Sequence, residues 1–145
     1  MEKSLKAKKR FEETDFSCSQ SVFSTLAPDL GMDEENALKI ASAFGGGMSR
    51  HGEVCGAVTG ALMSLGLEFG SASPDNEEKI RIASQKLMHQ FKERNGSLLC
   101  RELLGYHLIV PEEREKAKES SVFNKVCPLL VKDATELAVK ILNKS

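Results

Sequence analysis

The sequence predicts an all-α protein, a single-domain helical bundle of six or seven helices with its cysteines near helix N-termini. Apolar residues recur at helical spacings, as at Cys18, Val22 and Leu26, whereas the alternating β-branched pattern of strands is missing. With 145 residues, of which 41% are apolar, the chain is long enough for one domain with its own core. No internal repeat or low-complexity tract divides it.

The first elements are defined by their caps. Residues 1–15 are expected to form a polar N-terminal helix that is prone to fraying, followed by a single four-cysteine helical domain over residues 16–145. Ser17 is a good N-cap for the second helix, which ends near Pro28. Asp33 is expected to cap a third helix.

A glycine-rich loop, GGGMSRHG at residues 45–52, precedes a helix predicted from about Glu53 to Glu68. Small residues then recur at every fourth position, namely Gly52, Gly56, Gly60 and Ser64. Small residues at this spacing form a groove that allows close helix packing. We expect the groove to bring a second cysteine-bearing helix close to Cys55.

The second half begins with a long helix predicted from about Asp75 to Arg94, which Asn95-Gly96 ends. A short helix containing Cys100 follows. A further first turn is indicated at Pro111, although residues 106–124 otherwise carry little signal. The last helix is predicted to have Cys127 at its cap and proline at its first helical position.

The four cysteines are the main chemical signal. Each lies at or within the first turn of a predicted helix, where unpaired N–H groups and a partial positive charge favour thiolate over thiol. Four thiolates are the donor set of a tetrahedral zinc site or an iron–sulfur cluster. The candidate metal ligands or redox thiols are Cys18, Cys55, Cys100 and Cys127.

Cys55 is the candidate reactive thiolate. Arg50 and His51 lie nearby in sequence and are expected to depress its pKa. The supporting residues predicted around it are Gly45, Gly46, Gly47, Arg50, His51, Gly56 and Gly60. A buried cysteine that acts as a small apolar side chain is the plainer interpretation of the same position.

Charge and hydropathy exclude several classes of partner. The formal net charge of −1 argues against nucleic acid, which requires a basic excess. No apolar signal segment is visible, and the apolar run over residues 54–67 is too short to cross a bilayer, so we expect no membrane insertion and a cytoplasmic location. Cytosolic cysteines are more often metal ligands, redox thiols or core residues than disulfides. A redox partner protein is expected, and the chain is also compatible with a homodimer.

Four segments carry a resemblance to a known family. They are FSCSQSVF at residues 16–23, GGGMSRHGEVCGAVTGALMSLGL at 45–67, NGSLLCRELLG at 95–105 and Cys127-Pro128. Together they resemble the C_GCAxxG_C_C family of small redox-active proteins, over roughly Phe16 to Leu142. The resemblance implies a redox role for the four cysteines. An iron–sulfur cluster is compatible with it, because related domains occur in multi-cofactor electron-transfer proteins.

The leading hypothesis is therefore a redox-active protein without a defined catalytic reaction. In one version the four thiolates hold an iron–sulfur cluster and the protein transfers electrons. In the other no cofactor is needed, because the cysteines cycle between dithiol and disulfide with Cys55 as the attacking thiolate. The alternatives are a structural zinc site or partner-binding helical module without redox activity, and a soft-metal-handling accessory protein.

Overall fold

The computed structural model describes residues 2–144. Within them no β-strand is present, and one isolated antiparallel bridge joins Val54 to Leu99. The all-α class is confirmed. Eight helices have five residues or more, close to the predicted six or seven, and two α-turns and one 3₁₀ helix (η1) complete the set. In chain order the elements are α1 (Glu2–Glu13), α2 (Cys18–Leu26), η1 (Ala27–Leu30), α3 (Glu34–Ala41), α4 (Gly45–Met48), α5 (Gly56–Phe69), α6 (Glu78–Asn95), α7 (Cys100–Leu104), α8 (Pro111–Ser120), α9 (Val122–Lys125) and α10 (Cys127–Asn143).

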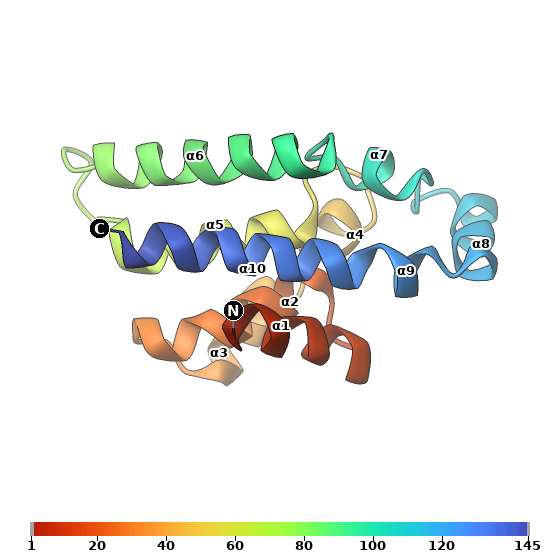
Figure 1. Cartoon of the computed structure of the whole chain (residues 1–145), viewed down its shortest axis with the longest axis horizontal. Coiled ribbons are helices and arrows are strands. Elements are labelled where there is room, and N and C mark those ends of the chain that lie inside the picture. The colour runs from red at the N-terminus through yellow and green to blue at the C-terminus, as the bar shows by residue number, and fades with distance from the viewer. Residues whose placement is uncertain (1, 145) are drawn as a thin grey trace.

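The helices form three layers (Figure 1). Helix α6 makes one outer layer, α5 and α10 make the middle layer, and α1, α2 and α3 make the other outer layer. The most extensive packing is that of α1 on α10 and of α2 on α5. The short elements α4, α7, α8 and α9 gather at one end of the layers, on the right of Figure 1.

The predicted caps are present. The Ser17 side chain accepts a hydrogen bond from the Gln20 N–H, and the Gln20 side chain accepts one from the Ser17 N–H, which completes a capping box at the start of α2. The Asp33 carboxylate accepts a hydrogen bond of 3.1 Å from the Asn36 N–H at the start of α3. These local bonds set where α2 begins, and therefore where Cys18 lies.

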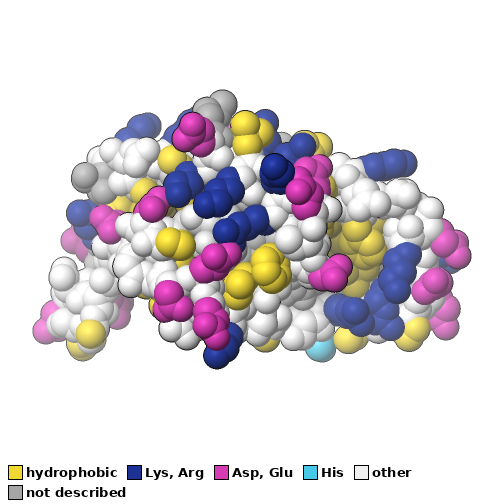
Figure 2. All heavy atoms as spheres, turned by 90° about the horizontal axis from the view of Figure 1, so that it is seen from below, with side chains coloured by type: hydrophobic (Ala, Val, Ile, Leu, Met, Phe, Trp, Pro, Cys, Tyr) yellow, Lys and Arg dark blue, Asp and Glu magenta, His cyan; other side chains and the backbone are white. Residues whose placement is uncertain are grey.

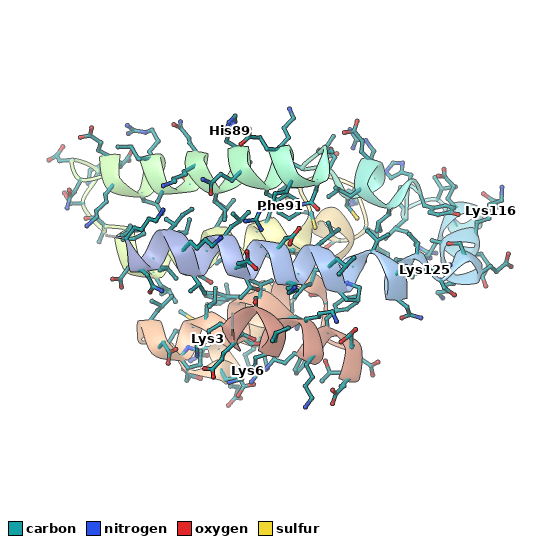
Figure 3. All side chains as sticks on the ribbon, viewed as in Figure 1. Lys3, Lys6, His89, Phe91, Lys116 and Lys125 are labelled. Atoms are coloured by element: carbon teal, nitrogen blue, oxygen red, sulfur yellow. The ribbon has the colours of Figure 1, made fainter. Side chains whose placement is uncertain are left out.

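The main core runs through all three layers, from α6 across α5 and α10 to α1 and α2. Leu87 and Phe91 of α6 are fully buried there and lie four residues apart on one face of the helix. Figure 3 shows Phe91 directed toward the middle layer and His89 directed away from it. His89 forms an exposed pair with Glu93 on the outer face.

Helix α1 is charged on its outer side and anchored on its inner side. Ser4 and Ala7 are fully buried. Lys3 forms an ion pair of 2.6 Å with Asp29 in η1, which follows α2. Helix α1 also packs on α10, so the first helix contacts the last. No helix within residues 2–144 combines the length and the apolar character needed to cross a membrane.

Candidate functional site

Each cysteine lies at the start of a helix, as predicted. Cys18, Cys100 and Cys127 are the first residues of α2, α7 and α10, and Cys55 is the N-cap of α5. Two starts are shifted from the prediction. Helix α5 begins at Gly56 rather than near Glu53, and in α10 Cys127 is already helical and Val126 takes the cap position. Helices α2, α5 and α10 begin at the same end of the layers (Figure 1). Topology therefore collects four helix starts that are distant in sequence.

The four cysteines line one cavity of about 110 Å³. Cys55, Cys100 and Cys127 are buried, and Cys18 is half-buried. Apart from the cysteines the walls are mainly apolar, and the backbones of Gly46 and Gly56 complete them. The apolar and aromatic wall residues are Phe11, Leu104, Leu108, Phe123 and Leu130. We call this space the cysteine cavity.

Backbone hydrogen bonds hold two of the cysteines in place. The Cys55 N–H donates to the Leu98 carbonyl at 2.8 Å, and the Cys100 N–H donates to the Glu53 carbonyl at 2.7 Å. These reciprocal bonds flank the bridge between Val54 and Leu99, so the start of α5 and the start of α7 are fixed to each other. An ion pair of 2.6 Å between Arg101 and Glu53 lies on the outer side of this junction.

A comparison with protein families agrees with this arrangement. A family model described as "Putative redox-active protein (C_GCAxxG_C_C)" matches residues 16–141, which include all four cysteines. The chain belongs to the C_GCAxxG_C_C family. No curated protein and no solved structure matches it. Membership in this family supports a redox role for the cysteine cavity.

In this family member the glycine-rich segment is a left-handed turn. Residues 46–50 all have positive φ, between 51° and 70°, a conformation that costs non-glycine residues roughly 1–2 kcal/mol each. Gly47 is essential to it, because an added Cβ would lie 2.7 Å from the Cys100 Cβ and 2.7 Å from the Glu53 N. Gly45 likewise allows close approach to Ser17, at 2.8 Å from its Cβ. Because these glycines lack a side chain, their backbone lies directly against the elements that carry the cysteines.

Two glycines of α5 do the same for α2. A Cβ at Gly56 would lie 3.3 Å from the Cys18 Cβ, and one at Gly60 would lie 2.7 Å from the Ser19 carbonyl oxygen. The predicted groove thus receives the cysteine-bearing start of α2. Gly52 is not part of it, because it precedes α5 and packs against Arg101 and His107 instead.

The expected depression of the Cys55 pKa is wrong. Burial raises the pKa of the Cys55 thiol to about 11, although the Ala57 and Val58 N–H groups at the start of α5 act in the opposite direction. Burial also raises the pKa of Cys100 to about 12, with further increases from the Cys55 and Cys127 sulfurs. Both groups are therefore protonated thiols at neutral pH.

Arg50 and His51 do not act on Cys55 as the sequence suggested. Both side chains are exposed, and neither is among the causes of the Cys55 shift. The left-handed turn carries them away from the sulfur, and His51 interacts through Nδ1 with the Ser49 carbonyl at 3.2 Å. Closeness in sequence is therefore not closeness to the thiol.

Cys18 and Cys127 form an interacting pair. A hydrogen bond between the Cys18 and Cys127 thiols lowers the pKa of Cys127 and, together with burial, raises that of Cys18 well above its ordinary value. Cys127 is the cysteine whose pKa is lowered, whereas burial raises that of Cys55, so Cys127 is the better candidate for a thiolate. Neighbouring Cys55 and Cys100 also disfavour charge on Cys18.

Sequence reasoning missed the walls of the cavity. Phe11 comes from α1, ahead of the residues that match the family, and Phe123 comes from α9, in a segment without readable signal. Helix α1 is dominated by charged residues and α9 has only four residues, so neither gives an apolar pattern that marks these phenylalanines as cavity walls. Within residues 2–144, no three His, Cys, Asp or Glu side chains are arranged to hold a metal ion as they stand.

Proposed function

We propose that the four cysteines hold an iron–sulfur cluster and that the protein transfers single electrons. The observation that carries the proposal is that Cys18, Cys55, Cys100 and Cys127 all line one shielded apolar cavity. Four cysteine sulfurs are the usual ligand set of such clusters. A bound cluster would supply one-electron chemistry, and burial and nearby N–H groups are the protein's means of tuning its potential.

The pKa values of the thiols support the same proposal. Burial and, after it, negative charge on Cys55 or Cys127 raise the pKa of Cys100, so several thiolates together are unfavourable in the cavity without a cation. Cationic iron offsets this repulsion, and ligation then releases the thiol protons. A dithiol site needs two cysteines, whereas here four helix starts supply four.

The test is iron and acid-labile sulfide content, with a visible spectrum, on protein purified without oxygen. We expect iron, sulfide and charge-transfer absorption, all lost in Cys100→Ser and Cys127→Ser. The exposed His89→Ala variant is the control and keeps them. Colourless protein without iron or sulfide would overturn the proposal, and so would full cluster content in Cys55→Ser. Zinc alone would favour the structural alternative.

A second candidate rests on the hydrogen bond between Cys18 and Cys127. In this version the Cys127 thiolate attacks a disulfide of a partner protein and forms a mixed disulfide, releasing one thiolate of the partner. Cys18 gives up its proton and attacks Cys127, so the partner leaves with two thiols or thiolates and a Cys18–Cys127 disulfide remains. Two electrons pass from this protein to the partner.

Mass spectrometry of metal-free protein exposed to a small disulfide separates this candidate from the first. We expect the loss of two hydrogens per chain and a peptide that links Cys18 to Cys127. Iodoacetamide is expected to alkylate Cys127 before Cys55 and Cys100. Linkage through Cys55 and Cys100 alone, or equal alkylation of all four, would contradict it.

A further inference from the structure

A second hollow adjoins the cysteine cavity. It encloses about 510 Å³, within the range of roughly 300–1,000 Å³ usual for small-molecule sites. Four residues line both spaces, namely Ser17, Gly46, Leu108 and Phe123. Figure 2 shows a hollow on the right of this face with hydrophobic side chains at its bottom and Lys and Arg side chains at its edge. We call the larger space the basic cleft.

The basic cleft is positively charged. Arg50, Arg114 and Lys118 line it, and no Asp or Glu is among the described residues that do so. Within residues 2–144, none of these three cations forms an ion pair with a carboxylate, unlike Arg101 at the neighbouring junction, which pairs with Glu53. Cations without counter-charges in a concave wall attract anions.

Two of the cations are placed by the backbone. The Arg114 side chain is half-buried and donates from Nη1 to the Leu108 carbonyl at 3.0 Å, so its remaining guanidinium donors are free for a ligand. Arg50 ends the left-handed turn, and its Cγ lies 3.1 Å from where a Gly46 Cβ would be. The stem of Arg50 therefore lies against Gly46, a residue that lines both spaces.

The floor of the cleft is apolar. Leu108 is buried and Phe123 is half-buried, and both separate the cleft from the cysteines. An aromatic ring beside guanidinium groups suits a ligand with an apolar body and an anionic group, because arginine binds carboxylate and phosphate through paired N–H donors.

We propose that the basic cleft binds a small organic anion, one that carries a phosphate or carboxylate group and an apolar body, beside the cysteine cavity. Its body lies on Leu108 and Phe123, and its anionic group meets Arg50, Arg114 and Lys118. Binding itself needs no cluster. Only the consequence, that this ligand is the small-molecule electron partner of the cysteines, rests on the proposed function.

Calorimetric titration of the full chain tests the proposal. The probes are flavin mononucleotide, whose anionic group is a phosphate, and anthraquinone-2-carboxylate, whose anionic group is a carboxylate; both have an aromatic body. Riboflavin is the match for the first probe without its phosphate. We expect at least one of the two anions to bind, and the stronger of them identifies the source of the anionic group. If flavin mononucleotide is that ligand, riboflavin binds about tenfold more weakly or worse.

Charge-matched variants decide where binding occurs. Arg50→Gln with Lys118→Gln removes two cations of the cleft, and Lys116→Gln with Lys125→Gln removes two that do not line it. Lys116 and Lys125 lie on α8 and α9 at the end of the molecule (Figure 3). We expect the first pair to weaken binding about tenfold or more and the second pair to leave it within about twofold.

Two results would overturn the proposal. They are no binding of either anion at millimolar concentration, and binding that the cleft pair of variants weakens no more than the control pair does. Failure of the cluster proposal is a separate result, because it is measured by iron and sulfide content and not by anion binding. Anion binding by cluster-free protein would leave the cleft established and the electron transfer refuted.

Discussion

The two ends of the middle layer are built differently. Along most of their length α5, α6 and α10 pack through long side chains such as Leu65, Leu87 and Phe91, all fully buried, in a core cluster that reaches Cys55. At one end short elements converge through cysteines and glycines, and a smaller apolar cluster forms around Cys100, Cys127 and neighbouring leucines. The first region is stabilised by the apolar surface that it removes from water. In the second region, strained backbone holds the cysteines in position, which lowers local stability.

This difference implies that stability and chemistry can be changed separately. Substitutions in the main core should lower the free energy of unfolding without altering the cysteine cavity in the molecules that remain folded. Substitutions in the left-handed turn should disturb the cavity even where the fold survives. The predictions below go from the largest expected effect on stability to the smallest.

Phe91→Ala should be the most destabilising, because it leaves a void in the main core. We expect the free energy of unfolding to fall by about 3–5 kcal/mol, measured by urea denaturation. Alkylation rates of the four cysteines in folded protein should stay unchanged. A loss below about 1 kcal/mol would show that the core around α6 is less tightly packed than described.

Gly47→Ala should disturb the cysteine end. The alanine would require φ +70° and would place its Cβ against Cys100 and the Glu53 backbone, for a cost of about 2–4 kcal/mol and a displaced Cys100. Gly96→Ala is the matched control, with φ +88° and nothing within 4 Å, so it tests strain alone at about 1–2 kcal/mol. Equal losses of stability in the two variants, together with an unchanged alkylation rate of Cys100 in Gly47→Ala, would refute the close approach of Gly47 to Cys100.

Alkaline pH should weaken metal-free protein through its buried thiols. The folded pKa of Cys55 is about 11 against an ordinary value of 9.0, so the folded state holds its proton longer than the unfolded state. Stability is therefore complete below about pH 9 and falls as pH rises toward 11, by about 3 kcal/mol from this group.

Urea midpoints from pH 8 to 11 measure the effect, and Cys55→Ala is the control. The slope of stability against pH should be shallower in that variant. An identical slope in both proteins would mean that Cys55 titrates as it does in the unfolded chain.

His89→Ala should have the smallest effect. Its pair with Glu93 spans 3.5 Å between side chains that are 75% and 66% exposed, and exposed pairs contribute about 0–1 kcal/mol. We expect a change within about 0.5 kcal/mol by the same urea measurement. A larger loss of stability would mean that His89 makes a stabilising contact other than its exposed pair with Glu93.

The fold could be read from the sequence because its determinants are local. Ser17 and Asp33 cap helices through side chains three residues from their partners, and the apolar stripe of α6 repeats at helical spacing. Helix starts at the four cysteines were predictable for the same reason. Their meeting in one cavity depends on how the layers are ordered, which no local pattern encodes.

The electrostatics of the site could not be read in the same way. Sequence proximity of Arg50 to Cys55 suggested a depressed pKa, but the left-handed turn removes that charge and burial dominates. The pairing of Cys18 with Cys127 joins the start of the domain to its last helix. Phe11 and Phe123, which close the cavity, carry no motif that marks them.

The wide separation of the cysteines along the chain has a consequence for synthesis. Because Cys127 begins the final helix, a growing polypeptide has made α1 through α9 before the last sulfur exists. Contacts of such long sequence separation are slow to form. Three of the thiols are therefore made before the fourth, and a group held by all four could be completed only after residue 127 has been synthesised.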